Sequence, residues 1–181
     1  VDPSRRSQVF IGIKKMGPGE PFDFQKPIKR EGILVYASAD DGASWRAVAE
    51  LPASDIFLIV SDPTSPLEAR ALIVFTEKAV YRVDSLSGES RALPLPSAVR
   101  YLNHASAAAD PINGAIVFHM VAYVELPGST AGATILRSRD LGETWQDCCS
   151  GLAALNPASP PWVSQVSACA ADARRVWAVV E

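Results

Sequence analysis

The chain has 181 residues, of which 48% are hydrophobic, and its formal net charge is −3. This length can bury a substantial core, and the mildly acidic charge with scattered basic residues argues against a nucleic-acid partner. No apolar run approaches the roughly 18 residues that a membrane-spanning helix needs. These bulk properties indicate a globular protein whose partners are neither nucleic acid nor membrane.

Short β-rich runs follow one another along the chain, and segments with helical periodicity are nearly absent. Gly, Pro, Asn and Asp separate the runs about every eight to twelve residues, which is typical of an all-β fold. The predicted strands, in chain order, are 8–14, 32–39, 45–51, 56–60, 70–76, 79–83, 90–95, 115–124, 133–140 and 144–148, and the sequence stops within a further strand that follows Asp172.

A small apolar residue followed by Asp-Pro recurs before several of these runs. The aspartates are Asp2, Asp62 and Asp110, and a weaker copy at Asp172 has Ala173 in place of Pro. Since Pro cannot donate to a ladder and Asp readily caps a turn, Asp-Pro marks a strand end. Four strands per unit of roughly 40–50 residues predict propeller blades. The predicted units are 1–61, 62–109, 110–171 and an incomplete 172–181.

The chain begins at Val1 in mid-pattern and ends in an apolar run, so we expect it to be a fragment. The predicted fold is all-β, a partial β-propeller of about three to four four-stranded antiparallel blades. Each predicted unit starts in the turn between the first and second strands of a blade, so the units are circularly shifted relative to the blades. The missing blades of the same chain would then be its partners. Exposed blade edges predict that the chain on its own associates or aggregates.

A second repeat, Ser-x-Asp-x-Gly-x-(Ser/Thr)-Trp, occurs as SADDGASW at 38–45 and as SRDLGETW at 138–145. Four fixed positions that include Trp should match by chance on the order of once per few hundred thousand windows. A degenerate copy between them keeps Asp84 and Gly88. The repeat therefore indicates a structural unit that is built more than once.

The residue types of this repeat suit a hairpin turn. Gly42 and Gly142 can adopt positive φ without a Cβ clash. Asp40 and Asp140 can accept bonds from backbone N–H groups in the turn, and the hydroxyls can do the same more weakly. The tryptophan supplies an apolar plate that can hold the turn against the blade.

The repeat resembles the Asp-box (BNR repeat) of β-propellers in the sialidases, xyloglucanase-type glycoside hydrolases, sortilin-like receptors and photosystem assembly factors. The resemblance implies that the motif lies at the blade periphery, away from any substrate pocket, and favours a secreted or periplasmic location. It therefore implies a structural role, and not that of catalytic acids or calcium ligands. The matching residues are Ser38, Asp40, Gly42, Ser44, Trp45, Ser138, Asp140, Gly142, Thr144 and Trp145.

Two function classes follow from this resemblance. The favoured one is a binding or scaffold module for a glycan or protein ligand, with no catalysis in this segment. The alternative is part of a glycan-active glycoside hydrolase, sialidase-like or xyloglucanase-like, whose catalytic carboxylates are shared with the missing blades. The sialidase Arg-Ile-Pro motif and the Thr-Asp-x-Gly-Gly-like xyloglucanase segment are both absent. A convergent pair of carboxylates about 5–10 Å apart would favour the hydrolase.

An insertion at 16–31 interrupts the first unit, and long loops on rigid scaffolds often carry function. It offers Glu20, Phe22, Asp23 and Phe24 as candidate ligand contacts, against the plainer interpretation of a variable surface loop. No catalytic residue can be assigned from the sequence.

Histidines and cysteines show no ligand spacing, so no metal and no cofactor are expected. His104 and His119 are interpreted as core or half-buried strand residues. Cys148 and Cys149 are adjacent and Cys169 stands apart, which favours ordinary thiols over a disulfide.

Overall fold

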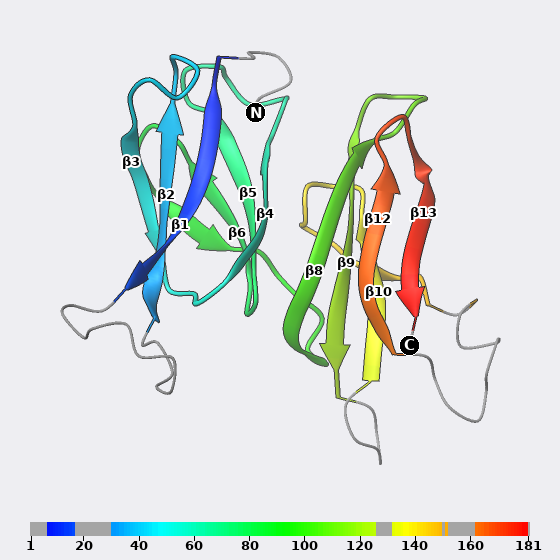
Figure 1. Ribbon diagram of the computed structural model, residues 1–181. Coiled ribbons are helices and arrows are strands. Elements are labelled where there is room, and N and C mark those ends of the chain that lie inside the picture. Colours follow the sequence, from blue (N-terminus) through cyan, green and yellow to red (C-terminus); the bar gives the residue numbers. More distant parts are fainter. Residues whose placement is uncertain (1–6, 17–29, 126–131, 150, 152–161, 181) are drawn as a thin grey trace. The chain divides into compact units, whose positions relative to one another are not determined.

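The computed structural model describes residues 7–16, 30–125, 132–149, 151 and 162–180, and the regular secondary structure of this part of the chain is almost entirely β-strand (Figure 1). The strands are β1 (Val9–Met16), β2 (Arg30–Ser38), β3 (Arg46–Leu51), β4 (Ile56–Ser61), β5 (Ala71–Thr76), β6 (Val80–Asp84), β7 (Ser90–Ala92), β8 (Val99–Ala109), β9 (Ile116–Val124), β10 (Gly132–Ser138), β11 (Gln146–Asp147), β12 (Val163–Cys169) and β13 (Asp172–Val180).

These strands form four antiparallel sheets, and within each sheet every strand pairs with the next one along the chain. The sheets are β1–β3, β4–β7, β8–β11 and β12–β13. A four-stranded meander, as in the second and third sheets, is the unit from which propeller blades are built. The predicted all-β, propeller-like fold is confirmed.

Most predicted strands lie within a few residues of the described ones, but β8 and β12 had no predicted counterpart. β8 is rich in alanine and polar residues, and its pairing with β9 shifts register in two places. Its buried side chains are Leu102, Ala105 and Ala108, every third residue and not every second. A search for strict alternation therefore misses this strand. β11 ends at Asp147, so the adjacent cysteines lie beyond it and not within a strand.

The Asp-Pro repeat marks the connection between the first and second strands of a sheet. Asp62 lies between β4 and β5, and Asp110 lies between β8 and β9. Asp172, in the copy without Pro, is the first residue of β13. Pro fits these turns because it has no N–H to donate.

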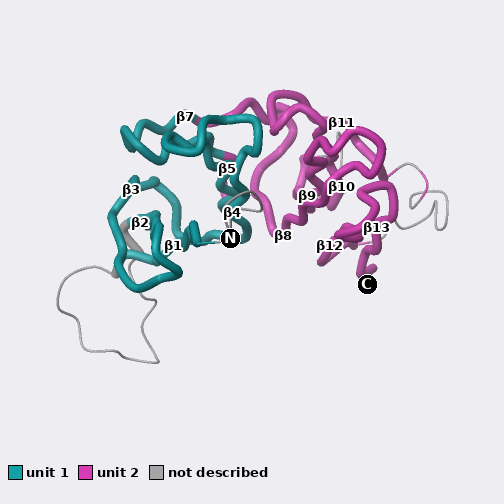
Figure 2. Tube along the Cα trace, turned by 90° about the horizontal axis from the view of Figure 1, so that it is seen from above, with its two compact units in different colours: residues 1–77, 81–91 teal, residues 78–80, 92–181 magenta. Residues whose placement is uncertain are grey.

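The chain divides into two compact units, residues 1–77 with 81–91, and residues 78–80 with 92–181 (Figure 2). In unit 1, the first and second sheets share one apolar core. Full burial of each such side chain contributes roughly 1.5–3 kcal/mol. The largest members of this core are Ile33, Val35, Val48, Leu51, Leu72, Val74 and Val83.

In unit 2, the third and fourth sheets pack in a similar way. Val121 of β9 and Ile135 of β10 meet Val163 and Val166 of β12. A smaller cluster of Ala108, Val117 and Ala173 lies beside the Asp-Pro connection of the third sheet.

Candidate functional site

The first signature turn, Ser38–Trp45, joins β2 to β3. The buried Ser38 hydroxyl donates to Asp40 Oδ1 at 2.7 Å and accepts the Gly42 N–H at 2.8 Å. Asp40 accepts the Ser44 N–H at Oδ1 (2.9 Å) and the Ser44 hydroxyl at Oδ2 (2.7 Å). Both carboxylate oxygens of Asp40 therefore bind donors of its own turn.

The second signature turn, Ser138–Trp145, joins β10 to β11 and has the same bonds. Ser138 Oγ donates to Asp140 Oδ1 at 2.8 Å and accepts the Gly142 N–H at 2.8 Å. Thr144 donates its N–H to Asp140 Oδ1 at 2.9 Å and its hydroxyl to Oδ2. One set of residue types thus builds the same turn in two different sheets.

The backbone of both turns passes through the left-handed region at two consecutive residues. The φ angles are +57° at Asp41 and +89° at Gly42, and +58° at Leu141 and +91° at Gly142. Left-handed conformations are uncommon for residues that carry a Cβ, so the motif places its glycine at the larger of the two angles.

The signature tryptophans lie over these glycines. A Cβ added to Gly42 would lie 3.4 Å from Trp45 Cζ2, and one added to Gly142 would lie 3.5 Å from Trp145 Cζ2. The indole therefore covers the turn from its own hairpin, and glycine leaves room for the ring. Trp45 nevertheless keeps 41% of its surface exposed.

The turn donors hold the aspartates in the charged form. Hydrogen bonds from the Ser44 side chain and backbone, then from Ser38, lower the pKa of Asp40 to about 2. At Asp140, burial raises the pKa, but the bonds from Thr144 and Ser138 outweigh it and the net pKa is lowered. A carboxylate that is charged and saturated with donors is poorly suited to proton transfer.

The degenerate turn between β6 and β7 also uses an aspartate to bind the N–H groups of the turn, but with fewer side chains. Asp84 Oδ1 accepts the N–H groups of Leu86 and Ser87, both at 2.8 Å. These backbone bonds lower the pKa of Asp84. Gly88 keeps the positive φ, here +79°.

The aspartates of the Asp-Pro turns are buried and each binds an arginine. Asp62, 1% exposed, accepts Arg82 Nη2 at 2.9 Å, and Asp110, 5% exposed, accepts Arg139 Nη1 at 3.2 Å. Burial raises the pKa of Asp62, but its bonds to Thr64 and Arg82 outweigh it and the net pKa is lowered. Buried charges of this kind need such a partner.

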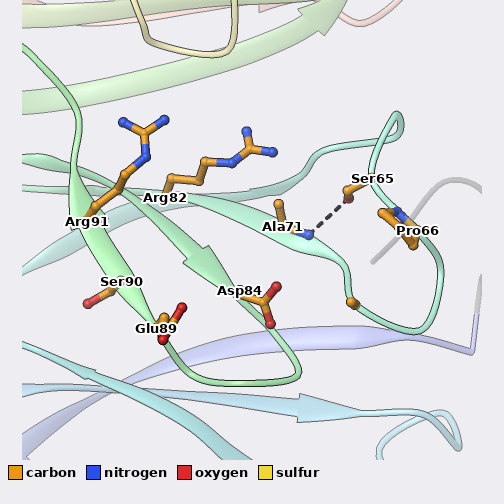
Figure 3. A pocket seen from close by; sticks show the side chains of 9 residues that line it. Ser65, Pro66, Ala71, Arg82, Asp84, Glu89, Ser90 and Arg91 are labelled. Carbon is orange, nitrogen blue, oxygen red and sulfur yellow. Dashed lines mark hydrogen bonds between the residues drawn. The ribbon is translucent and has the colours of Figure 1, made fainter.

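Beside the Asp62–Arg82 pair, unit 1 contains an open hollow of about 540 Å³ over β6, β7 and the loop before β5 (Figure 3). Arginine side chains lie on one side of the hollow and acidic side chains on another. The polar and turn residues that line it include Ser65, Pro66, Arg82, Asp84, Glu89 and Arg91.

Unit 2 carries a row of three aromatic rings. Tyr101 of β8 lies opposite Tyr123 of β9, and their rings stack at 4.3 Å between centroids and 22° between planes. Trp162, directly before β12, also lies against Tyr123, and their ring centroids are 4.6 Å apart. The middle ring is 5% exposed, whereas Tyr101 is 44% and Trp162 39% exposed.

The aromatic row, defined as Tyr101, Tyr123 and Trp162, lies where β8 begins, β9 ends and β12 begins, at the same end of unit 2 (Figure 1). Sequence reasoning missed it because Trp162 is far from the tyrosines along the chain. The tyrosine pair could have been found by aligning two neighbouring strands, but the register irregularities of β8 hide that alignment.

The predicted loop contacts Glu20, Phe22, Asp23 and Phe24 lie outside the described residues.

Both histidines lie on the paired strands β8 and β9, as interpreted from the sequence. His104 is half-buried and His119 is 4% exposed, and Nδ1 of each is buried without a hydrogen-bond partner. Burial, then the charges of Arg137 and Arg139, lower the pKa of His119 to about 4. His119 is therefore a neutral core residue at ordinary pH.

The described part of the chain has no cluster of side chains that could hold a metal ion, and its cysteines form no disulfide. No three or more His, Cys, Asp and Glu side chains come together there in an arrangement that could hold a metal ion. Cys148, Cys149 and Cys169 are free thiols. No helix within the described ranges has the length and apolar character to cross a membrane.

Comparison with known proteins finds similarity to solved structures. No family model and no curated protein sequence matches the chain. A crystal structure of an ancestral GH74 enzyme is similar over 77% of this chain, with 19% identity and a TM-score of 0.48. The match covers 18% of that enzyme, so the chain spans less than a fifth of its length.

Proposed function

We propose that this chain is a segment of an Asp-box β-propeller that binds a glycan, and that the aromatic row is where it binds. The observation that carries the proposal is the exposure of the two outer rings, Tyr101 at 44% and Trp162 at 39%, on a stack that is buried in the middle. The C–H face of a sugar ring packs against such an aromatic face, and the phenol and indole N–H supply polar contacts.

Contacts of both sheets of unit 2 position the row. Tyr101 and Tyr123 are cross-strand partners, and Asn103 Nδ2 donates to the Ser164 carbonyl at 2.9 Å, joining β8 to β12 beside Trp162. A preorganised platform loses little conformational entropy when it binds its ligand. The structure of the row therefore favours recognition over a purely structural use of three aromatic side chains.

An exposed ion pair is formed by residues next to the row in the chain. Arg100 precedes Tyr101 and forms an exposed ion pair with Glu125. Because exposed pairs of this kind contribute little to stability, both side chains can turn toward hydroxyl groups of a ligand at small cost. An apolar platform with a polar rim suits a neutral or weakly polar saccharide.

The charge state of the described carboxyls supports binding over hydrolysis. A glycosidase needs one carboxylic acid that is protonated near neutral pH, and its pKa is therefore raised. Within the described ranges, each carboxyl group with a clearly shifted pKa has it lowered. These groups are Asp40, Asp62, Glu77, Asp84, Asp140 and Asp172. The glycoside hydrolase stays the alternative, but no described contact favours it.

Isothermal titration of the 181-residue chain with β-glucan oligosaccharides and sialosides tests the proposal. We expect a ligand among the β-glucans, and Tyr101→Ala and Trp162→Ala should each weaken its binding by about 5- to 150-fold, which corresponds to the loss of a stacking contact of roughly 1–3 kcal/mol. The matched control is Trp177→Ala, since Trp177 is 58% exposed on β13 and lies outside the row.

Binding that survives both substitutions in the row, or that falls equally in Trp177→Ala, would contradict the proposed platform. Glycan turnover by the same protein would instead support the hydrolase alternative. Absence of binding to every glycan by a cooperatively folded chain would point to a protein ligand.

A further inference from the structure

We infer that β13 is the contact surface for a second copy of this chain, whose own β13 pairs with it in the antiparallel direction. The two β12–β13 hairpins then form one four-stranded sheet in the order β12–β13–β13–β12. None of the rings of the aromatic row lies on β13. The inference therefore goes beyond the proposed glycan platform and does not depend on it.

β13 is a long strand at the free edge of its sheet. It spans nine residues, and β12 is the one described strand that pairs with it (Figure 1). The last strands of the second and third sheets, β7 and β11, have three and two residues. A short edge strand offers few free N–H and C=O groups, whereas a long one is a template on which another strand can pair.

The opposite edge of the same sheet is covered by β8. The Ala168 N–H of β12 donates to Ser106 Oγ of β8 at 3.0 Å, and Asn103 Nδ2 of β8 donates to the Ser164 carbonyl of β12 at 2.9 Å. A strand that extends this sheet can therefore approach it at β13.

The second half of β13 is apolar, and much of it is exposed. Residues 176–180 read Val-Trp-Ala-Val-Val, without a charge or a proline. Two of the five side chains pack against the apolar core of unit 2. The other three, Trp177, Val179 and Val180, are 58%, 49% and 43% exposed. A free edge of this composition is suited to intermolecular strand pairing.

The charged residues of β13 lie at its beginning, and they exclude several registers of self-pairing. Arg174 and Arg175 are exposed, and both form ion pairs with Asp172 of the same strand. A two-fold axis between Arg174 and Arg175 would set arginine opposite arginine, which destabilises a sheet. An axis at Trp177 would set both arginines opposite valines of the second copy, where they would lose hydration.

A two-fold axis at Ala178 avoids both costs. It sets Trp177 opposite Val179 of the second copy and Val176 opposite Val180 of the second copy, and symmetry repeats each pair. Pairs of aromatic and β-branched residues across strands stabilise a sheet. Residues 176–180 then pair only with one another, and the arginines lie beyond them.

This self-complementarity identifies a second copy of the chain as the partner, because a two-fold contact requires that one surface match itself. The combined sheet has as many strands as the second and third sheets of the chain. Five residues per copy are fewer than the roughly 20–30 of a stable protein interface, so we expect a weak and reversible dimer.

Sedimentation equilibrium of the 181-residue chain, from about 5 to 500 µM, tests this inference. We expect a reversible equilibrium between monomer and dimer. Val179→Lys places a charge beside the axis and should raise the dissociation constant of the dimer at least about tenfold. The matched control is Leu86→Lys, since Leu86 is 65% exposed in a turn of unit 1 and should leave the dissociation constant unchanged.

A second measurement uses the unaltered chain, so it decides the question even if Val179→Lys fails to fold. In an equal mixture of ¹³C-labelled and unlabelled chain, isotope-filtered NOEs report contacts between copies alone. We expect such NOEs between the Trp177 ring and the Val179 methyl groups. NOEs that join β13 to a different strand of the second copy would contradict the pairing of β13 with itself.

A monomer at every concentration would overturn the inference, and if that monomer binds an added peptide of alternating threonine and valine, the edge serves a different protein. An equal loss of association in Leu86→Lys and Val179→Lys would also overturn it. Growth beyond the dimer would do the same, because a two-fold contact closes on itself. Unchanged dimerisation in Tyr101→Ala would separate this contact from the aromatic row.

Discussion

The Ser138–Trp145 turn and the Asp84–Glu89 turn close equivalent outer hairpins with different chemistry. In the former, a buried serine, an aspartate and a threonine bind one another and the backbone. In the latter, Asp84 binds mainly the backbone N–H groups of Leu86 and Ser87. Both turns have an aspartate acceptor and a left-handed glycine, Gly142 in the former and Gly88 in the latter. The comparison teaches that the hairpin requires a carboxylate acceptor and a left-handed glycine, whereas the serine and tryptophan reinforce it.

The largest expected effect comes from the shared glycine of the degenerate turn. A Cβ at Gly88 would lie 2.4 Å from the Val48 carbonyl oxygen, in addition to the strain at φ +79°. We expect Gly88→Ala to lower the free energy of unfolding by roughly 3–5 kcal/mol, measured by urea denaturation. The control is Gly114→Ala, where φ is +71° but no atom lies within 4 Å, and about 1–2 kcal/mol is expected. Equal losses in the two variants would mean that the close approach is unimportant.

The third sheet also differs from the second in holding both histidines. Because the pKa of His119 is lowered to about 4 from 6.5, the folded protein keeps it neutral while the unfolded chain takes up a proton. The stability that depends on a neutral His119 is fully present above pH 6.5. It is lost as the pH falls toward 4, and the loss in the free energy of unfolding is about 3 kcal/mol in all. In His119→Leu this part of the pH dependence should disappear from urea-unfolding curves, and its full persistence would contradict the burial of a neutral His119.

Replacing the serine of a signature turn should lower the free energy of unfolding by less than the changes above. The loss should still exceed that from replacing a serine of the degenerate turn. Ser138→Ala leaves the Gly142 N–H without its acceptor, and we expect a loss of about 2 kcal/mol in the free energy of unfolding. Ser87 accepts the Glu89 N–H at 3.2 Å in an exposed position, so Ser87→Ala should change stability by less than about 0.5 kcal/mol. Similar losses at both positions, compared by chemical denaturation, would remove the distinction between the turns.

The smallest effect is on the titration of the turn aspartates. Ser44→Ala removes the hydroxyl bond to Asp40 and should raise its pKa from about 2 toward 3.8, as followed by carboxyl ¹³C shifts. Stability from this group is present above pH 3.8 and is lost as the pH falls through about 2. Ser87→Ala should leave the pKa of Asp84 lowered, because the backbone donors remain. An unchanged Asp40 pKa in Ser44→Ala would show that its hydroxyl is not the main donor.

Local features of the fold could be predicted from the sequence because they depend on neighbouring residues. The Ser-x-Asp-x-Gly-x-(Ser/Thr)-Trp spacing brings Asp40 within reach of Ser38 and Ser44 in any tight turn. The Asp-Pro copies likewise indicate where the first strand of a sheet ends.

Long-range features could not be predicted in this way. The partners of Asp62 and Asp110 are arginines 20 and 29 residues away, and the aromatic row joins residues of three strand ends. These contacts depend on the register of the sheets. Bulges in β8 shift that register, so it does not follow from the simple alternation of side chains. The two arginines that line the hollow, Arg82 and Arg91, are an intermediate case, because their cross-strand position follows from the hairpin register once the degenerate turn is recognised.

The most direct test of the central claim, that the signature turns are structural and the aromatic row binds the ligand, uses the four tryptophans. Their indole N–H resonances can be followed in one ¹H–¹⁵N spectrum during titration with a β-glucan oligosaccharide. We predict that Trp162 shifts and saturates, while Trp45, Trp145 and Trp177 do not move. A saturating shift of Trp45 or Trp145 with Trp162 unchanged would place binding at the signature turns and contradict the claim.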